Sequence, residues 1–373
     1  MKKIGILTFH RAKSYGAVLQ AYALKQVLSK LNCSVSIIDY TCYVMRFGWR
    51  FNFLPGKIKL FIRFLKNFKS INSIKTYFNF NNFVNNFFVN KNTKQKNIEQ
   101  LYKLNENFDL FITGSDQVFN PRLTGFDKNY FLDFVKDKNK CFSYAASFGL
   151  TYDILTDEEK IFIKQNLQNF KYLSLREKQG AYIVNKLSNV KTEVNLDPTL
   201  LLNKQDWSKI SEKPKEDNFV VLYLLESDKK IVKFAYDLAK TKKMKLICFN
   251  LYNEKINMKM EIVNPTPQEW LGYMLNAKYI VTNSFHGITF SINFNKAFFV
   301  DFLTKNTVVS SRVENLLDLT GLRNRLIDNI GTDYDKAIDW TDINKIIEQG
   351  RDKSITYLKK VLTNFVYEDK NVD

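Results

Sequence analysis

The first forty residues give the clearest indication of the fold class. They contain an apolar run, "KIGILTF" (3–9), a longer segment, "AVLQAYALKQVLSKL" (17–31), and a second apolar run, "SVSIIDY" (34–40). Apolar residues recur in the middle segment at spacings of three and four, which is the period of a helix with one buried face. A strand, a helix and a second strand in this order predict a βαβ unit, and hence a mostly parallel sheet.

The same alternation continues beyond this unit in two series. Strand candidates are 109–114, 141–147, 172–177 and 192–197 in the first series, and 219–227, 245–250, 278–283 and 297–302 in the second. The polar stretch 203–218, which contains Pro214, lies between the two series and is the best linker. A chain of 373 residues is long enough for two domains. We therefore predict an α/β protein with domains over 1–205 and 216–340, followed by C-terminal helices over 341–373.

The positive charge is concentrated in one segment. The chain has 56 Lys and Arg against 38 Asp and Glu, a formal net charge of +18, which indicates an acidic partner. Residues 41–98 hold eleven Lys or Arg and no acid, and they include "KIKLFIRFLKNFK" (57–69) and "YFNFNNFVNNFF" (77–88). We predict a basic aromatic helical insertion over 41–100. Three interpretations stay open: an interfacial helix on an anionic membrane, a surface that stacks single-stranded nucleic acid, and an ordinary helix whose Phe residues enter the core.

Several kinds of site are disfavoured. Cys33, Cys42, Cys141 and Cys248 lie far apart without a CxxC pair, which predicts free thiols in a reducing cytoplasm. With two histidines and no carboxylate cluster we expect no metal site, and the chain has no P-loop or GxGxxG motif. The N-terminus does not resemble a signal peptide, and no stretch reaches the ~20 apolar residues that span a membrane. We expect a cytoplasmic protein, soluble or peripheral on the membrane.

Loops after strands are the places to look for a site, because ligands of open α/β sheets bind beyond the carboxyl ends of the strands. Ser14 is placed to cap a helix after the first strand, and Gly16 would let a ligand approach the start of that helix. Asp116 follows a later strand, and Arg176 ends the next one with a guanidinium that suits carboxylate or phosphate. A capped turn and a surface salt bridge are the structural alternatives. His10 also follows a strand, and we expect it on the surface.

The stretch "TNSFHG" (282–287) follows a strand of the second series. We predict that Ser284 and His286 lie in the loop and that Gly287 opens the next helix. Backbone N–H groups and the helix dipole there favour an anion, and the histidine can exchange a proton beside it. A histidine satisfied inside the core is the alternative, although this junction is an awkward place to bury one.

A further helix start in the same half carries Ser311 and Arg312. Arg312 offers a second planar cation for an oxyanion. Arg176, His286 and Arg312 together would suit a small dianion or trianion.

Seven short segments carry a recognisable pattern. They are "SYGAVLQAYAL" (14–24), "FDLFITGSDQVFNP" (108–121), "YAASFG" (144–149), "LSLREKQG" (173–180), "NLDPTLL" (195–201), "YIVTNSFHGITFSINFNKAF" (279–298) and "SSRVENLLDLTGL" (310–322). In this order they resemble the polysaccharide pyruvyl transferase family. The resemblance implies two Rossmann-like domains that face each other across a cleft, as in GT-B glycosyltransferases. It also implies transfer of pyruvate from phosphoenolpyruvate to two hydroxyls of one sugar, as a cyclic ketal.

The resemblance also implies roles for residues. The family's strand-end arginine corresponds to Arg176 and its loop histidine to His286, and we assign catalysis to these two residues and to Asp116. The expected donor-binding residues are Arg176, Ser284, His286, Gly287, Ser311 and Arg312. The expected acceptor-binding residues are Ser14, Tyr15, Gly16, Gln20, Ser115, Asp116 and Gln117. Ser14 stands where the family often has Asn, so the amide contact of that Asn is missing here.

The chemistry gives these residues specific tasks. His286 is the candidate that protonates the enol methylene or assists phosphate departure, and Asp116 is the candidate that accepts the proton of the acceptor hydroxyl. No cofactor is expected beyond phosphoenolpyruvate as co-substrate. The expected partners are a saccharide acceptor on a polyprenyl carrier in a bacterial capsule or exopolysaccharide pathway, and an anionic membrane surface for the basic segment. Nucleic acid is not expected.

Two other functions fit the same pattern. A GT-B-like glycosyltransferase would use the helix-end anion site for the diphosphate of a sugar nucleotide. A non-catalytic protein that binds carbohydrate or nucleic acid would release no phosphate, and its affinity for nucleic acid would fall steeply with salt.

Overall fold

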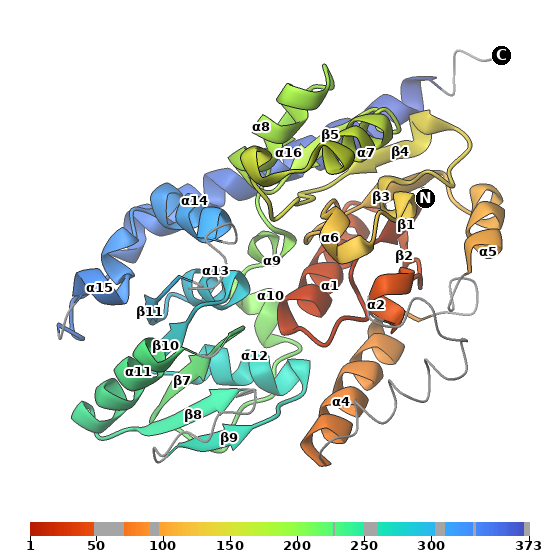
Figure 1. The fold of residues 1–373 in the computed structure, drawn as a ribbon. Helices are drawn as coiled ribbons and strands as arrows, with labels where there is room; N and C mark the ends of the chain where they lie inside the picture. The colour runs from red at the N-terminus through yellow and green to blue at the C-terminus, as the bar shows by residue number, and fades with distance from the viewer. Residues whose placement is uncertain are drawn as a thin grey trace. The chain divides into compact units, whose positions relative to one another are not determined.

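The computed structural model describes residues 1–47, 71–89, 97–226, 228–249, 260–302, 310–330 and 333–368. The chain divides into two compact units (Figure 1). The first unit comprises residues 1–201 and 350–373, and the second comprises residues 202–349. Each unit contains its own parallel sheet with helices, so the predicted fold class of two α/β domains is confirmed.

The first unit is built on a parallel sheet with the strand order β2-β1-β3-β4, and β5 and β6 form a second, two-stranded sheet. The strands are β1 Lys3–Leu7, β2 Ser34–Ile37, β3 Leu110–Thr113, β4 Cys141–Ser143, β5 Leu173–Leu175 and β6 Thr192–Val194. The α-helices are α1 Tyr15–Lys30, α2 Tyr43–Phe47, α4 Ile71–Phe87, α5 Ile98–Tyr102, α6 Pro121–Thr124, α7 Asp157–Leu167, α8 Lys178–Leu187 and α9 Pro198–Leu201. Short 3-10 helices are η2 Lys103–Glu106, η3 Lys128–Phe131, η4 Lys138–Lys140 and η5 Tyr152–Ile154.

Helix α1 is buried on more than one face. The predicted apolar face of Ala17, Ala21, Leu24 and Leu28 is buried, and so is Val18 on another side. The reason is that α1 packs against β2, against α9 and, through its aromatic residues, against α4. The βαβ prediction is confirmed, since β1 and β2 pair in parallel on either side of this helix in the sequence.

The described part of the basic aromatic insertion contributes to the core. Phe80 and Phe83 of α4 are buried, and so is Phe88, the residue directly after this helix. The Phe80 ring lies 5.0 Å from the ring of Tyr15 on α1. For these residues the interpretation as an ordinary core helix is confirmed, and a membrane or nucleic-acid surface made by them is wrong. The stretch 57–69 lies outside the described residues.

The second unit is built on a five-stranded parallel sheet with the order β11-β10-β7-β8-β9. Its strands are β7 Phe219–Tyr223, β8 Lys245–Phe249, β9 Glu261–Val263, β10 Tyr279–Thr282 and β11 Ala297–Val300. Its helices are α10 Lys204–Ser208, α11 Lys229–Thr241, α12 Pro267–Asn276, α13 Phe285–Asn293, α14 Ser310–Thr320, the 3-10 helix η6 Arg323–Arg325, and α15 Ile327–Ile330.

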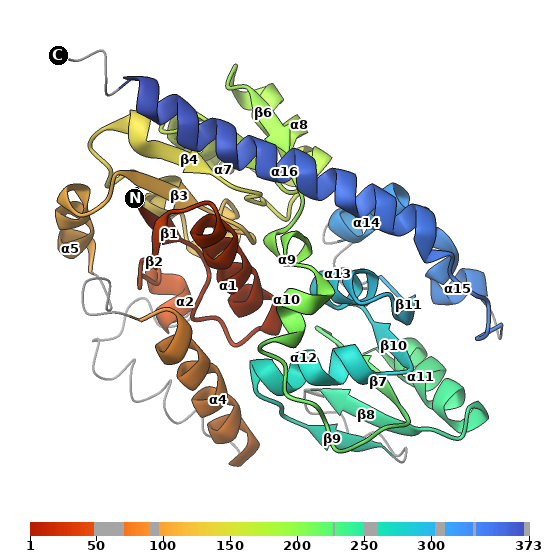
Figure 2. The ribbon, with the colours of Figure 1, turned by 180° about the vertical axis from the view of Figure 1, so that it is seen from behind.

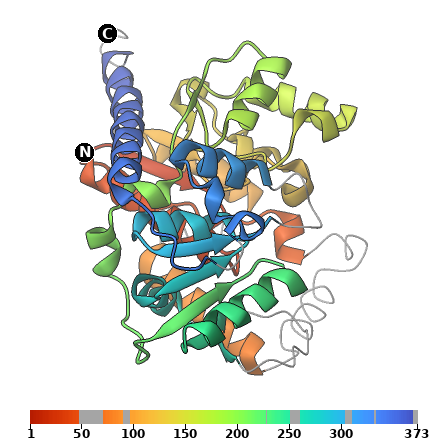
Figure 3. The same cartoon turned by 90° about the vertical axis from the view of Figure 1, so that its left-hand side faces the viewer.

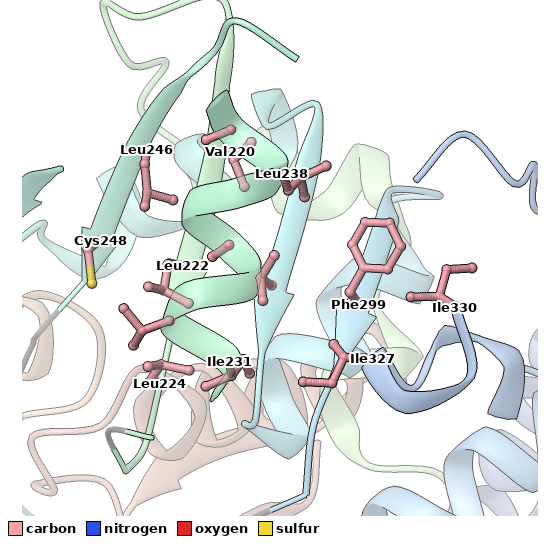
Figure 4. Close-up of a cluster of buried hydrophobic side chains, with 14 residues drawn as sticks. Val220, Leu222, Leu224, Ile231, Leu238, Leu246, Cys248, Phe299, Ile327 and Ile330 are labelled. Atoms are coloured by element: carbon pink, nitrogen blue, oxygen red, sulfur yellow. The ribbon is translucent and has the colours of Figure 1, made fainter. Parts of the chain in front are cut away.

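Helix α11 covers one face of this sheet (Figures 3 and 4). Ile231 and Leu238 of α11 pack on Leu222 of β7 and on neighbouring strands, as Figure 4 shows. These positions follow the helical period in a segment whose other side is rich in lysine, so the burial was readable from the sequence.

Where C-terminal helices were predicted over 341–373, the structure has one long helix, α16 Trp340–Glu368. From Gly350 onward it belongs to the first unit, where it lies beside β4 (Figure 2). The Tyr357 hydroxyl donates to the Ser143 carbonyl at 3.0 Å, and the Ser354 hydroxyl accepts from the Leu196 amide at 3.1 Å. The boundary between the units falls after Leu201, close to the predicted residue 205.

Candidate active site

In the first unit a buried arginine gathers three carboxylates. Arg176 follows β5, and its Nη1 lies 2.8 Å from Asp197 Oδ2, its Nε 3.6 Å from Glu177 Oε2 and its Nη2 3.9 Å from Asp116 Oδ1. Burial opposes the positive charge, but the three carboxylates outweigh it, so the pKa of Arg176 is raised. We call Ser115 and these four residues the first-unit cluster. Arg176 is buried, so the surface salt bridge considered from the sequence is wrong.

Asp197 is the most completely held carboxylate of the first-unit cluster. Its Oδ1 accepts from the amide and the hydroxyl of Thr199 at 3.0 and 2.8 Å. Its Oδ2 accepts from Arg176 and, at 3.3 Å, from the Ser115 hydroxyl. Asp197 owes this position to the turn that Pro198 makes at the start of α9. A carboxylate held by so many donors is fixed in orientation.

The loop after β3 requires glycine. Gly114 has φ +122°, and a Cβ there would lie 2.3 Å from the Tyr144 carbonyl oxygen. The Ser115 hydroxyl donates to the Ala145 carbonyl at 2.8 Å, and its amide donates to Gln20 Oε1 at 3.2 Å. Gln20 is buried on α1 and its amide group also donates to Thr8 Oγ1 at 2.9 Å. Gln20 therefore stabilises this loop through hydrogen bonds from its buried side. Direct contact between Gln20 and the acceptor sugar stays a prediction.

Asp116 is the carboxylate of the first-unit cluster with the most exposed side chain. Its backbone has φ +72°, a left-handed conformation that Asp tolerates better than most residues. Its Oδ1 accepts from the Gln117 amide at 2.8 Å. Gln117 is half-buried, and its Oε1 accepts from Asn120 at 3.1 Å. Asp116 is thus both oriented by its neighbours and accessible.

The start of α1 is placed as predicted, but it is built differently. Ser14 occupies the N-cap position, yet its side chain makes no capping hydrogen bond. Tyr15 and Gly16 are buried in the first turn of α1. Of these three residues Ser14 is the one that is part-exposed, and the contact of all three with an acceptor stays a prediction.

His10 corrects a sequence prediction. It is 1% exposed, not on the surface, and its Nε2 lies 2.9 Å from Asp39 Oδ1. Arg11 also donates to Asp39, through Nη2 at 2.6 Å. The contact was missed because the two residues are far apart in sequence. The signal was available, since His10 and Asp39 follow β1 and β2, which are neighbouring parallel strands.

In the second unit, hydrogen bonds of Thr282 fix the loop after β10 to the ends of β10 and β7. The Thr282 hydroxyl donates to the Tyr223 carbonyl at 2.6 Å and accepts from the Ser284 amide at 3.0 Å. Ser284 caps α13, because its Oγ accepts from the Gly287 amide at 3.3 Å. A Cβ on Gly287 would lie 2.3 Å from Thr282 Oγ1, so glycine lets the helix start close to β10.

His286 and Arg312 both contact Phe285. The helix begins at Phe285, so His286 lies in its first turn rather than in the loop, and Gly287 follows within the same turn. The His286 ring centroid is 5.2 Å from that of Phe285, and Arg312 Cζ is 5.8 Å from the Phe285 centroid. His286 is 8% exposed and Arg312 6%. We call Ser284, Phe285, His286 and Arg312 the second-unit cluster. Ser311 precedes Arg312 in α14, and its side chain lies outside the described residues.

Asp301 is a residue that the sequence reasoning missed. It follows β11, and its amide donates to the Thr282 carbonyl at 3.3 Å, which places it beside the loop that carries Ser284. Burial raises the pKa of Asp301, and Lys230, whose Nζ is 3.4 Å from Oδ2, works against that shift. An acid directly after a buried strand was the signal in the sequence.

Other sequence predictions can be compared with the described residues. All four cysteines are free, as predicted, and the structure also buries them. Burial raises the pKa of Cys141 and of Cys248 to about 12. Within the described ranges, no three His, Cys, Asp or Glu side chains are grouped so that they could hold a metal ion. Among the helices described here, none combines the length and the apolar character that crossing a membrane requires.

Solved structures of low sequence identity share this architecture. UDP-GlcNAc 2-epimerase from Methanocaldococcus jannaschii is 14% identical, with a TM-score of 0.51 over 98% of this chain and 100% of its own. The Neisseria meningitidis UDP-GlcNAc 2-epimerase bound to UDP-GlcNAc is 10% identical, with a TM-score of 0.50 over 98% and 100%. S. aureus MnaA, in a co-structure with UDP, is 11% identical, with a TM-score of 0.52 over 97% of each chain. The fold is therefore GT-B-like, as predicted.

The family follows from the sequence itself. The model of the polysaccharide pyruvyl transferase family matches residues 15–300, and the chain belongs to that family. The matched range includes Asp116, Arg176 and His286, and it ends before Arg312. No curated protein matches the chain.

Proposed function

We propose that this chain transfers the pyruvyl group of phosphoenolpyruvate to two hydroxyls of one sugar, as a cyclic ketal. The acceptor in this proposal is a repeat unit of a bacterial capsule or exopolysaccharide, carried on a lipid at the inner face of the plasma membrane. Membership of the polysaccharide pyruvyl transferase family supports the reaction class. The observation that supports phosphoenolpyruvate as the donor is the second-unit cluster. In it, His286 and Arg312 both contact the Phe285 ring at the start of α13.

The second-unit cluster suits the charges of phosphoenolpyruvate. The donor carries its carboxylate and its phosphate on the same carbon, so it needs cationic groups and N–H donors close together. The start of α13 supplies backbone N–H groups and the positive end of a helix dipole. Arg312 adds a planar guanidinium, which binds carboxylate and phosphate through paired hydrogen bonds. In this proposal Phe285 keeps the guanidinium and the imidazole in place from the side.

The proposed reaction balances without a cofactor. The methylene carbon of phosphoenolpyruvate gains a proton, and the first sugar hydroxyl adds to the neighbouring carbon and loses its proton. The C–O bond to phosphate breaks, and the second hydroxyl adds to the same carbon with loss of its proton. The products are the ketal and inorganic phosphate. We assign to His286 the protonation of the methylene carbon. We assign to Asp116 the removal of the proton from the first hydroxyl.

The first-unit cluster supports the acceptor side of the proposal. A sugar offers hydroxyl donors, which carboxylates accept, and Asp116 is the accessible carboxylate of the cluster. Arg176 holds Asp116, Glu177 and Asp197 at fixed spacings, so we assign it the positioning of these acids. Direct contact between Arg176 and the donor, which the family resemblance implies, stays a prediction.

Titration calorimetry with phosphoenolpyruvate tests the donor assignment. We expect binding by the wild-type chain and a loss of affinity of roughly ten- to a hundredfold in Arg312→Gln and His286→Gln, because each removes a charge-assisted contact. Arg323→Gln, which changes an exposed arginine of the same unit, is the matched control. Equal affinity in all four proteins would refute the donor site. Binding of UDP-GlcNAc without binding of phosphoenolpyruvate would favour a sugar-nucleotide enzyme instead.

A further inference from the structure

Two lysines stand directly before neighbouring strands of the second unit. Lys278 directly precedes β10 and Lys296 directly precedes β11. The two strands pair in parallel with Tyr279 opposite Ala297, so the lysines lie side by side at the amino edge of the sheet. This edge is opposite to the carboxyl ends from which Ser284 and His286 follow (β10 and β11 in Figure 1).

A third lysine is brought to the same edge by α10. The Asn293 side chain, at the end of α13, donates to the Leu202 carbonyl at 2.8 Å. The Trp207 ring of α10 packs edge-on against Phe290 of α13, with ring centroids 5.0 Å apart. These contacts hold the start of α10, and therefore Lys204, next to the turn between α13 and β11. We call Lys204, Lys278 and Lys296 the lysine cluster.

The lysine cluster lacks acidic partners. Some lysines of this unit are paired, such as Lys233 with Asp237 at 2.6 Å and Lys230 with Asp328 at 2.7 Å. In the described part of the chain no carboxylate forms an ion pair with any member of the cluster. Burial, together with the charges of Lys204 and Lys278, lowers the pKa of Lys296 to about 8. Lys296 is part-buried and Lys204 and Lys278 are exposed beside it, so the two exposed charges repel a third ammonium that water reaches only in part.

We propose that Lys204, Lys278 and Lys296 form a binding site for a phosphoryl group, separate from the second-unit cluster. A multiply charged oxyanion would offset the repulsion among the three ammonium groups, and its tetrahedral oxygens can accept from several of them at once. Lysine suits this ligand because its ammonium is a compact charge with three donors that tolerate varied angles. The phosphoryl group has two possible sources, a soluble phosphate compound and the headgroup of an anionic phospholipid. The site does not depend on the proposed transferase reaction.

Protection of Lys296 from chemical acetylation tests the site residue by residue. An amine with a pKa of about 8 reacts readily near neutral pH, so Lys296 reports on its own occupancy. Peptide mass spectrometry of the full chain would follow acetylation in inorganic phosphate, in vesicles of phosphatidylcholine with phosphatidylglycerol, and in sodium chloride of equal ionic strength. At a probe concentration of ten times Kd we expect about tenfold slower labelling of Lys296, by mass action. The exposed Lys240 is the internal control and should not change.

The two probes distinguish the sources of the phosphoryl group. Protection by inorganic phosphate would identify a site for soluble phosphates, and protection by vesicles alone would identify a headgroup site. In the second case Lys278→Gln/Lys296→Gln should lose vesicle co-sedimentation, whereas Lys229→Gln/Lys240→Gln, with the same loss of charge on α11, should keep it. Labelling of Lys296 at the chloride rate in both probes would overturn the proposal.

Discussion

Replacing Arg176 with methionine tests whether charge holds the first-unit cluster together. The guanidinium is buried and lies 2.8, 3.6 and 3.9 Å from three carboxylates. At an effective dielectric constant of about 20, each such pair interacts by about 4–6 kcal/mol. Desolvation of the four groups offsets most of this attraction. Removing one partner of a buried ion pair then leaves uncompensated charge, so we expect Arg176→Met to lower the free energy of unfolding by about 3–5 kcal/mol.

Urea unfolding followed by far-ultraviolet circular dichroism measures this change, and hydrogen exchange of the segment 173–201 localises it. The matched control is Arg122→Met, because Arg122 also pairs with a glutamate, Glu159, at 2.7 Å, but its side chain is 45% exposed. That variant should lose less, about 1–2 kcal/mol, because water can reach the position of the half-exposed Arg122 side chain and the buried Glu159 still accepts from the Thr156 amide at 2.8 Å. Asp197→Asn completes a double-mutant cycle with Arg176→Met, and the double variant should lose clearly less than the two single losses combined. A loss in Arg176→Met no larger than in Arg122→Met would refute the reasoning.

Three further predictions concern the second unit. Gly287→Ala should lower stability by about 1–3 kcal/mol in thermal unfolding despite a better helix propensity, because its Cβ meets Thr282 Oγ1 at 2.3 Å, and adding Thr282→Ala should restore part of the loss. Lys296→Met should raise stability at pH 7 by about 1–2 kcal/mol, a figure discounted for the partial exposure of Lys296. The sign follows because the pKa of Lys296 is about 8 in the folded chain against an ordinary 10.5, so the unfolded chain binds more protons between these pH values and wild-type stability rises there. The advantage of Lys296→Met should therefore shrink as the pH rises from 8 to 10.5 in urea titrations, and a constant advantage would contradict the assignment. Phe285→Ala should weaken phosphoenolpyruvate binding in calorimetry, because the ring contacts both His286 and Arg312, and unchanged affinity would remove it from the site.

Local sequence patterns predicted the architecture because a buried strand or helix face requires apolar residues at regular spacings. The apolar spacing of residues 17–31 indicated α1, and the apolar runs 219–223 and 279–282 indicated β7 and β10. Helix boundaries were less predictable. His286 was expected in a loop, but the Ser284 side chain caps α13 two residues earlier than expected and draws the histidine into the first turn.

The contacts of the candidate site were harder to predict, because they join residues that no periodic pattern links. Arg176 pairs with Asp197 and Asp116 from separate loops, and nothing in the spacing identifies either partner. The pairing of His10 with Asp39 depends on β1 and β2 being neighbours in the sheet. In each case the topology had to be known before the strand-end residues could be matched.

Turnover of phosphoenolpyruvate tests the central claim most directly. The purified chain would be incubated with phosphoenolpyruvate and a panel of galactose-, glucose-, mannose- and N-acetylhexosamine-terminated acceptors, with inorganic phosphate and acceptor mass measured together. We predict phosphate release in step with one acceptor gaining the mass of pyruvate less one water, and neither signal in His286→Ala of unchanged circular dichroism. Sugar transfer from a sugar nucleotide to the same panel, without phosphate release from phosphoenolpyruvate, would contradict the account.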